Sequence, residues 1–410
     1  MTASINNTRI SLVLALALVL SCATTSPAQT SSRSKRAPAA AKTTPQQDAA
    51  FDNAVKLADE ARNAGRLDQA IASYSDALRI RPKWPDGWWY VGAIFYEKDL
   101  YEQARDAFRN LVSLEPNRGP AWGMLGLCEF QTRDYERAVT SLQRGRSAGF
   151  AGNQELESVV RYHTALLYIR FEQFEIGNQI LREFLRFGNS SPKIVEAFGL
   201  TILRMPFLPA EIPADKREEV LLAGQAGLAM AARRFDEARS AFDTLLSRYP
   251  NDPNVHYSFG VFQLAQDADA ALKEFQRALE LSPTHQPAMV QMAFEYLKRD
   301  QYKEALPLAE RAVQLDPKMY PARNVLGRLL IELGQIDRAI KELEEGVKLA
   351  PSSPEMHFAL ARAYTRAGRK QDADRERDTF KALQDKYNQE SDAAQTGSAP
   401  GTNPAKPNPD

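Results

Sequence analysis

Apolar and small residues recur along this chain with the spacing of paired amphipathic helices. Between Phe51 and Pro82 they lie three or four positions apart, which is the spacing of one face of a helix. Gly65 interrupts this stretch near its middle, and glycine readily adopts the left-handed conformation that ends a helix. Pro82 stops the second helix, because proline lacks the amide hydrogen that a helix interior needs. The pattern predicts two helices joined by a tight turn.

The same unit recurs with a fixed length. Prolines and small residues stand 34 positions apart in two blocks: Pro82 and Pro116; Pro317 and Pro351; Ala70, Ala104 and Ala138; Ala271, Ala305, Ala339 and Ala373. A unit of this length cannot bury its apolar face alone, so it must stack on its neighbours. The sequence therefore predicts an all-α solenoid.

The repeated unit resembles the tetratricopeptide repeat. Trp88, Gly92, Ala104 and Pro116 stand where this family has a bulky residue, a small residue, a second small residue and a closing proline. The small residues matter because the two helices of a repeat cross most closely there. The resemblance implies a right-handed superhelical solenoid of about eight or nine helix-turn-helix repeats.

Breaks in the pattern divide the chain. The expected parts are a signal peptide over 1–28, a disordered linker over 29–50, an N-terminal array over 51–188 whose last unit is degenerate, a helix with a proline-rich insertion over 189–218, a C-terminal array with a capping helix over 219–388, and a disordered tail over 389–410. The linker and the tail have too few large apolar residues to offset the entropy of ordering. The insertion contains Pro206, Pro209 and Pro213, so it is irregular. It either joins the two arrays or forms an exposed apolar loop that binds a partner.

The first residues have the features of an export signal. Arg9 precedes an apolar stretch from Ile10 to Leu20, which only Ser11 interrupts, and small residues follow it. This stretch of about 11 residues is shorter than the roughly 20 that a membrane-spanning helix needs. The residues that end in Cys22 resemble the lipobox of bacterial lipoproteins, which implies lipidation of Cys22 and anchoring at the outer membrane. Cleavage after Ala28 is the alternative, and it predicts a free periplasmic or secreted protein.

Composition and motifs argue against several functional classes. Lys plus Arg and Asp plus Glu both number 52, so the net charge is zero and the basic stripe of a nucleic-acid binder is absent. The four histidines stand singly, without the spacing of metal ligands, and the sequence has neither a glycine-rich phosphate loop nor a serine elbow. Cys128 lies among apolar residues, where a lone thiol behaves as a small buried hydrophobe. We expect no catalytic residue, no metal and no cofactor.

In the tetratricopeptide arrays that this chain resembles, the first helix of each pair lines a concave groove. The residues at the corresponding positions are aromatic rings, one asparagine and three arginines: Trp89, Tyr96, Phe130, Tyr162, Phe294, Asn324, Arg328, Phe358, Arg362 and Arg366. Flat rings give large contact area at little cost in rotamer entropy, and arginine pairs with carboxylates through two hydrogen bonds. The resemblance implies a protein or peptide partner in this groove. The alternative is that these side chains pack on the neighbouring repeat.

Together these features predict a non-enzymatic scaffold or adaptor of the bacterial cell envelope, which meets the membrane only through an anchor at Cys22. Two alternatives stay open: a secreted carrier or regulator that binds peptide or cell-wall glycan, and an accessory subunit of an envelope enzyme. Binding of a chaperone's acidic tail is disfavoured, because Val55 and Asp59 stand where such members of the family use lysine and asparagine.

Overall fold

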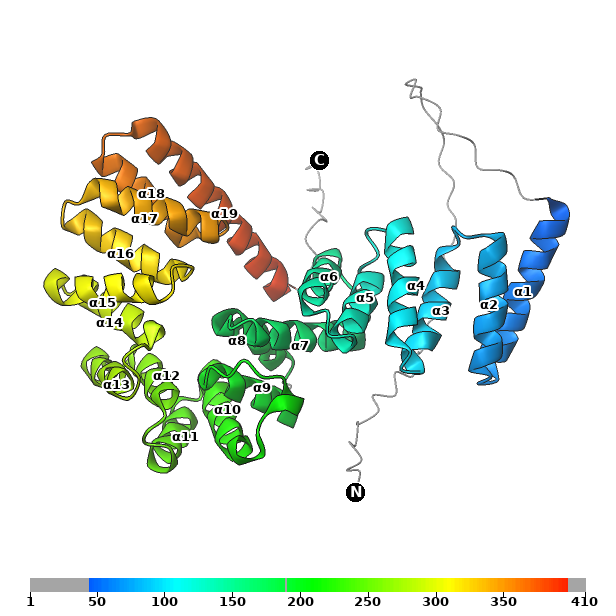
Figure 1. Ribbon diagram of the computed structural model, residues 1–410, viewed down its shortest axis with the longest axis horizontal. Coiled ribbons are helices and arrows are strands. Elements are labelled where there is room, and N and C mark those ends of the chain that lie inside the picture. Colours follow the sequence, from blue (N-terminus) through cyan, green and yellow to red (C-terminus); the bar gives the residue numbers. More distant parts are fainter. Residues whose placement is uncertain (1–43, 189, 397–410) are drawn as a thin grey trace, which may run out of the picture. The chain divides into compact units, whose positions relative to one another are not determined.

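The computed structural model describes residues 44–188 and 190–396, and within them it contains 19 α-helices and no β-strand (Figure 1). Nine helices begin a pair: α1 (Pro45–Asn63), α3 (Pro85–Glu97), α5 (Gly119–Gln131), α7 (Gln154–Arg170), α10 (Arg217–Ala231), α12 (Pro253–Gln263), α14 (Gln286–Lys298), α16 (Tyr320–Glu332) and α18 (Pro354–Arg366). Nine complete a pair: α2 (Leu67–Ile80), α4 (Tyr101–Leu114), α6 (Tyr135–Ala148), α8 (Phe174–Arg182), α11 (Phe235–Arg248), α13 (Ala268–Leu281), α15 (Tyr302–Leu315), α17 (Ile336–Leu349) and α19 (Lys370–Thr396). The remaining helix, α9 (Pro192–Ile202), stands between the fourth and fifth pairs. The architecture is the helical solenoid that the repeat pattern predicts.

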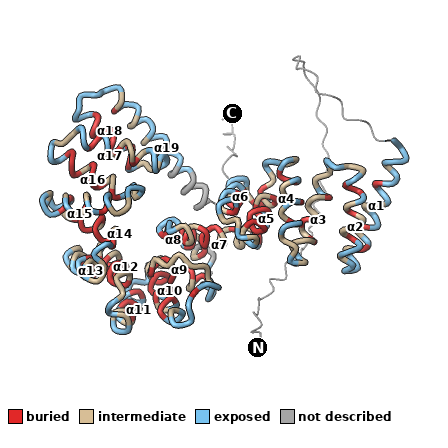
Figure 2. Tube along the Cα trace, viewed as in Figure 1, coloured by how far each residue is buried: buried red, intermediate tan, exposed pale blue. Residues whose placement is uncertain are grey.

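Each pair closes where a small residue of the first helix meets the second helix. A β-carbon added to Gly126 in α5 would lie 2.6 Å from the side chain of Leu142 in α6, closer than real atoms approach. Ala104 and Ala138, on the second helices, are fully buried. Buried residues follow the sides of the helices that face their neighbours (Figure 2). Larger side chains at these crossings would push the helices apart.

A recurrent hydrogen bond ties the start of a first helix to the proline before it. A side-chain nitrogen donates to the carbonyl oxygen of a proline six positions earlier in five pairs: Trp88 to Pro82 and Trp122 to Pro116 (both 2.8 Å), and His256 to Pro250, Arg323 to Pro317 and His357 to Pro351 (all 2.9 Å). Carbonyls just after a helix lack a partner within it, so this donor satisfies an otherwise orphaned acceptor. Indole, imidazole and guanidinium groups can all act as this donor, because each places an N–H within hydrogen-bond distance of the proline carbonyl.

Most of the turns within the pairs share one conformation. Within the described residues, eight of the nine turns have a residue with positive φ two positions after the last residue of the first helix: Gly65, Asp99, Arg133, Glu172, Arg233, Asp300, Gly334 and Gly368. Glycine adopts this conformation without steric cost, whereas other residues adopt it at a cost of roughly 1–2 kcal/mol. The left-handed turn that Gly65 predicts therefore also forms in pairs that have no glycine at this position.

The proline-rich insertion packs against the array. Arg170 of α7 donates to the carbonyl of Pro206 (2.9 Å) and pairs with Glu211 (3.3 Å). Ile212 is buried, and the side chains at 205, 207 and 208 are partly buried against the core formed by α7 to α12. The segment thus joins α9 to α10 with its apolar residues turned toward the core.

Two expected boundaries of disorder are wrong. Helix α1 already begins at Pro45, because Thr44 and Gln47 form a reciprocal capping box, so residues 45–50 are helical rather than part of a disordered linker. Helix α19 continues to Thr396, because no glycine or proline interrupts it before that residue, so residues 389–396 are helical rather than a disordered tail. The expected signal peptide, with Cys22, and residues 397–410 lie outside the described residues. Among the helices that are described, none has the length and apolarity to span a bilayer.

Candidate partner-binding surface

The aromatic residues predicted to line a groove lie on first helices and contact the neighbouring helix or pair. The ring of Trp89 on α3 lies 5.7 Å from that of Phe108, and the guanidinium of Arg118 lies 5.0 Å above it. The ring of Phe130 on α5 lies 4.8 Å from that of His163 on α7. Both Trp89 and Phe130 remain partly exposed. Each ring is therefore held by the next repeat and still presents one side to solvent.

The two predicted tyrosines are packed in the same manner. Tyr96 lies edge to face with Tyr101, at 5.3 Å between ring centroids, and Tyr162 lies 5.6 Å from His163. Burial raises the pKa of Tyr96 to about 12, and burial also raises the pKa of Tyr162. Both hydroxyls therefore stay protonated at neutral pH.

Most of the predicted C-terminal groove residues form inter-repeat contacts. Phe294 lies beneath the guanidinium of Arg328, 5.1 Å from it, and Asn324 donates to the carbonyl of Glu355 (3.2 Å). Arg362 pairs with Glu332 of the preceding pair at 2.8 Å. Burial, and then the charge of Arg362, lower the pKa of Arg328. These side chains join α14, α16 and α18 into one row.

Phe358 and Arg366 differ from the residues of that row in their exposure to solvent. Both are exposed, and the side chain of Phe358 is 51% accessible to solvent. They border a cavity of about 530 Å³ between α18 and α19, which is lined by Phe358, Ala361, Arg362, Thr365, Arg366, Arg377, Phe380 and Lys381. Of these, Phe358, Arg362 and Arg366 were predicted. Ala361 and Thr365 of α18 were not, and neither were Arg377, Phe380 and Lys381, which lie on the second helix of the pair. The departure of Arg377 from the apolar pattern of the other second helices was the signal that could have identified them.

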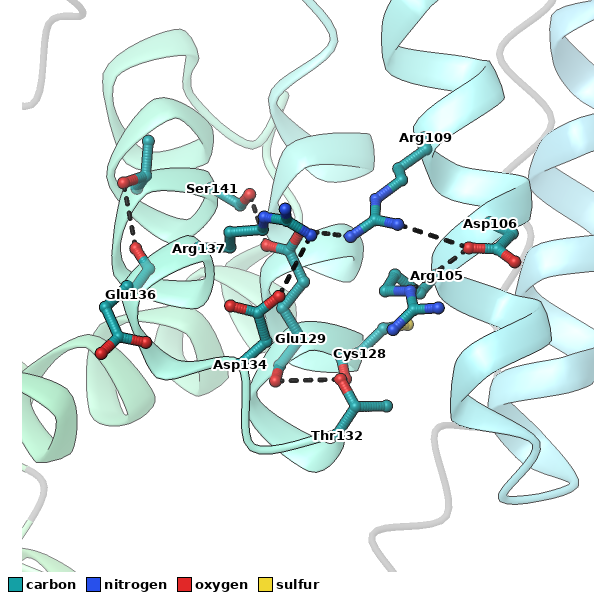
Figure 3. A network of polar contacts seen from close by, with 11 residues as sticks. Arg105, Asp106, Arg109, Cys128, Glu129, Thr132, Asp134, Glu136, Arg137 and Ser141 are labelled. Carbon is teal, nitrogen blue, oxygen red and sulfur yellow. Dashed lines mark hydrogen bonds and ion pairs between the residues drawn. The ribbon is translucent and has the colours of Figure 1, made fainter.

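A polar network around a buried carboxylate crosses α4, α5 and α6 (Figure 3). The carboxylate of Glu129 is 2% exposed, accepts a hydrogen bond from the Ser141 hydroxyl at 2.6 Å, and lies 3.5 Å from Arg109. A cavity of about 360 Å³ lies over it, beside Arg144 and Trp122. This network was not predicted, although a glutamate between Cys128 and Phe130 in an apolar helix was its signal. Cys128 itself is fully buried and its pKa is raised by burial, so it is the inert hydrophobe that was expected.

The histidines have structural partners. His256 lies 2.7 Å from Glu274, which raises the pKa of the imidazole. His285 caps α14 by accepting from the amide of Ala288 (3.1 Å), and burial lowers its pKa to about 4. Burial likewise lowers the pKa of His163. Nowhere in residues 44–188 and 190–396 do three potential metal ligands gather.

Comparisons with known proteins find relatives that match only short segments of this chain. The general transcriptional corepressor trfA of Dictyostelium discoideum is 27% identical over 142 residues, which is 35% of this chain and 10% of that protein. The probable biofilm formation methyltransferase WspC of Pseudomonas putida is 40% identical over 74 residues, 18% of this chain and 17% of that protein. The BBSome complex member BBS4 homolog of Drosophila melanogaster is 22% identical over 143 residues, 35% of this chain and 28% of that protein. The chain thus spans less than a third of each relative's length.

Solved structures of the protein MamA match part of this chain. A structure of MamA from Desulfovibrio magneticus RS-1, residues 41 to the end, is 24% identical with a TM-score of 0.36, and covers 40% of this chain and 94% of its own. A double mutant of MamA RS-1 is 24% identical with a TM-score of 0.37, over 41% of this chain and 94% of its own. Family models described as tetratricopeptide repeat match residues 55–117, 94–150, 224–285 and 296–362. These matches cover more than half of the chain, and with the nine helix pairs they show that it belongs to the tetratricopeptide repeat proteins.

Proposed function

We propose that this chain is a non-enzymatic scaffold that binds a protein partner along the face formed by its first helices. The observation that carries the proposal is the set of half-buried rings typified by Trp89 and Phe130, each fixed by the next repeat. A ring that is already immobilised loses little entropy when a partner covers its free side. Inter-repeat packing and partner binding are therefore compatible roles for the same side chains.

The partner we propose is a protein segment rather than a small molecule. Tetratricopeptide arrays generally mediate protein–protein interaction, and their extended surfaces suit a segment of chain. The BBSome relative is named as a member of a complex, but the segment it shares with this chain covers only 28% of its length. Specificity would come from the few side chains on the first-helix face, since the fold alone does not choose a ligand.

A site in the bacterial cell envelope is the second part of the proposal. It rests on the apolar stretch after Arg9 and on the lipobox-like residues that end in Cys22. Expression with a radiolabelled fatty acid tests it: label on the wild-type chain and none on Cys22→Ser supports a lipid anchor. A mature N-terminus at Gln29 without label would instead support a free periplasmic or secreted protein.

Crosslinked affinity capture from the native envelope tests the scaffold proposal. Wild-type chain, Trp89→Ala/Phe130→Ala, and the control Phe235→Ala are compared by mass spectrometry; Phe235 is a phenylalanine on α11 that is 55% exposed. We expect one set of proteins to be lost only with the double variant.

Thermal unfolding of each variant must be measured alongside the capture, because both rings also stabilise inter-repeat contacts. Unaltered capture by a folded double variant would contradict the proposed surface. Retention of a glycan, or of one envelope enzyme, would instead favour a carrier or an accessory subunit.

A further inference from the structure

The last pair, α18 and α19, exposes a position that every earlier pair buries. Phe380 on α19 is only partly buried. The equivalent residues of the eight other pairs are all buried: Ala77, Leu111, Gly145, Phe184, Leu245, Ala278, Ala312 and Gly346. In the adjacent pair the covering group is known, because a β-carbon on Gly346 would collide with the side chain of Met356 on the next first helix. Phe380 therefore stands where a further first helix would pack.

A second position of α19 shows the same contrast. The residues equivalent to Arg377 are fully buried in all other pairs: Tyr74, Phe108, Leu142, Leu181, Phe242, Phe275, Ala309 and Leu343. Arg377 is exposed and donates instead to the Thr365 hydroxyl at 2.7 Å. Part of the apolar filling of a normal pair is thus missing here, and the cavity of about 530 Å³ lies along this edge.

Helix α19 itself explains why this end face, formed by Phe358, Arg366, Arg377, Phe380 and Lys381, is uncovered. The preceding second helix, α17, ends at Leu349 and the chain turns back to form α18. Helix α19 runs on to Thr396, so no following first helix returns over the face within residues 44–396. The chain continues the helix where the repeat would turn.

Contacts at the preceding junction give the register of a docked helix. Asn324 contacts Glu355 and Met356, near the start of the next first helix, and Glu332 pairs with Arg362, near its end. In the last pair the residue equivalent to Asn324 is Phe358, and the one equivalent to Glu332 is Arg366. A helix stacked in the same register therefore places its start over Phe358 and its ninth residue beside Arg366.

The charges on the end face and the size of Phe380 indicate what kind of helix could bind there. Arg366 and Lys381 have no ion-pair partner among the described residues, while Arg362 and Arg377 are paired with Glu332 and Asp374. An unbalanced cationic edge favours carboxylates. Because Phe380 replaces a glycine, the helix that covers it needs a small residue where α18 has Met356.

We propose that the end face binds an acidic amphipathic helix of a partner protein, stacked as the next first helix, with a small residue against Phe380 and a carboxylate against Arg366. This interaction is separate from partner binding along the first-helix face. It assigns Phe358 and Arg366 to the end of the array rather than to its groove.

Two synthetic peptides test the proposal on the full-length chain. Both carry residues 351–366 with Met356→Ala, and one also carries Arg362→Glu, so that a carboxylate occupies the ninth helical position. We expect the glutamate peptide to bind about tenfold more tightly than the arginine peptide in fluorescence anisotropy at low salt, because the pairs differ in charge sign. The protein variant Arg366→Glu should reverse that preference, whatever its effect on overall affinity.

Two further variants separate docking from folding. Phe358→Asn with Phe380→Ala restores residues found in internal pairs and should lower affinity about tenfold, because it removes apolar contact area from the face. Phe235→Ala, a matched substitution of an exposed ring on α11, should leave affinity unchanged. No saturable binding, no preference for the acidic peptide, or no reversal by Arg366→Glu overturns the proposal. A concentration-dependent dimer in sedimentation velocity that Phe358→Asn abolishes would assign the face to a second copy, and would equally overturn it.

Discussion

The arrays before and after α9 fulfil the same structural requirement with different side chains. Before α9, Trp88 and Trp122 donate to the carbonyl of the preceding proline. After α9, His256 and His357 occupy the same place and also contact carboxylates. An indole donor does not titrate near neutral pH, whereas the imidazole of His256, whose pKa is raised by its hydrogen bond to Glu274, does. The repeat specifies a donor at a position, and the choice of donor decides whether the stability of that junction depends on pH.

The largest expected effect concerns the feature that the two arrays share. Ala104 lies before α9 and Ala339 after it, and both are fully buried at a helix crossing. Replacing either by leucine should destabilise the chain by roughly 1–3 kcal/mol, because the extra methyl groups overpack the crossing. Thermal unfolding of the two variants checks the prediction. A loss at one site and none at the other would show that the arrays are not packed alike.

His285, the cap of α14, should make the C-terminal array sensitive to acid. Its neutral imidazole accepts from the amide of Ala288 and contacts Asn254 at 3.2 Å, and its pKa is lowered to about 4 by burial. The unfolded chain binds this proton more readily, so its contribution to stability is full above pH ~6.5 and is lost as the pH falls toward 4. Protonation also removes the lone pair that caps the helix. The loss should be on the order of 2 kcal/mol.

The variant His285→Asn provides the control, because asparagine caps helices without titrating. Unfolding in denaturant at pH 7.5 and at pH 4.5 is compared for both chains. Wild type should lose more stability between the two pH values than the variant does. Equal losses would remove His285 as the origin of acid sensitivity.

The proline-carbonyl donors should give a smaller effect that separates the arrays directly. Trp88→Phe deletes the donor before α9 and should cost about 1 kcal/mol at every pH, the ordinary value of one hydrogen bond. His256→Phe deletes a donor whose imidazolium form is stabilised by Glu274, which raises its pKa. A raised pKa contributes stability that is full below pH ~6.5 and is lost as the pH rises through the folded value. The cost of His256→Phe should therefore be greater at pH 5.5 than at pH 8.5, and a cost independent of pH would contradict this assignment.

The helix pairs could be predicted from sequence because each is encoded locally. Small residues such as Ala104, prolines such as Pro116 and apolar spacing all repeat at one period, so each repeat confirms the others. The ends were less predictable. The capping box at Thr44 starts α1 earlier than composition suggested, and the absence of breakers lets α19 run to Thr396. A capping interaction, or the absence of a helix-breaking glycine or proline, depends on a few residues. The overall composition of a segment does not reveal it.

The site was less accessible to sequence reasoning, because exposure depends on what the next repeat covers. Trp89 and Phe130 occupy positions transferred from the family, yet only the structure reveals that Arg118 and His163 hold their rings. Glu129 and Arg377 each replace an apolar residue of the repeat pattern. A comparison of equivalent positions across the repeats would have identified both, whereas a search for recognised motifs could not.

The smallest expected effect concerns the turns. Arg133, before α9, and Gly334, after it, both have positive φ, 62° and 72°. Arg133→Gly should stabilise the chain by up to about 1 kcal/mol, because relief of the strained conformation exceeds the entropy that glycine adds to the unfolded chain. Gly334→Ala should destabilise it by about 1 kcal/mol for the converse reason. Denaturant unfolding of both variants at one pH provides the measurement. Opposite signs would show that the left-handed turn is set by the stacking of the repeats and that glycine only lowers its cost; destabilisation by both would mean that Arg133 contributes contacts of its own.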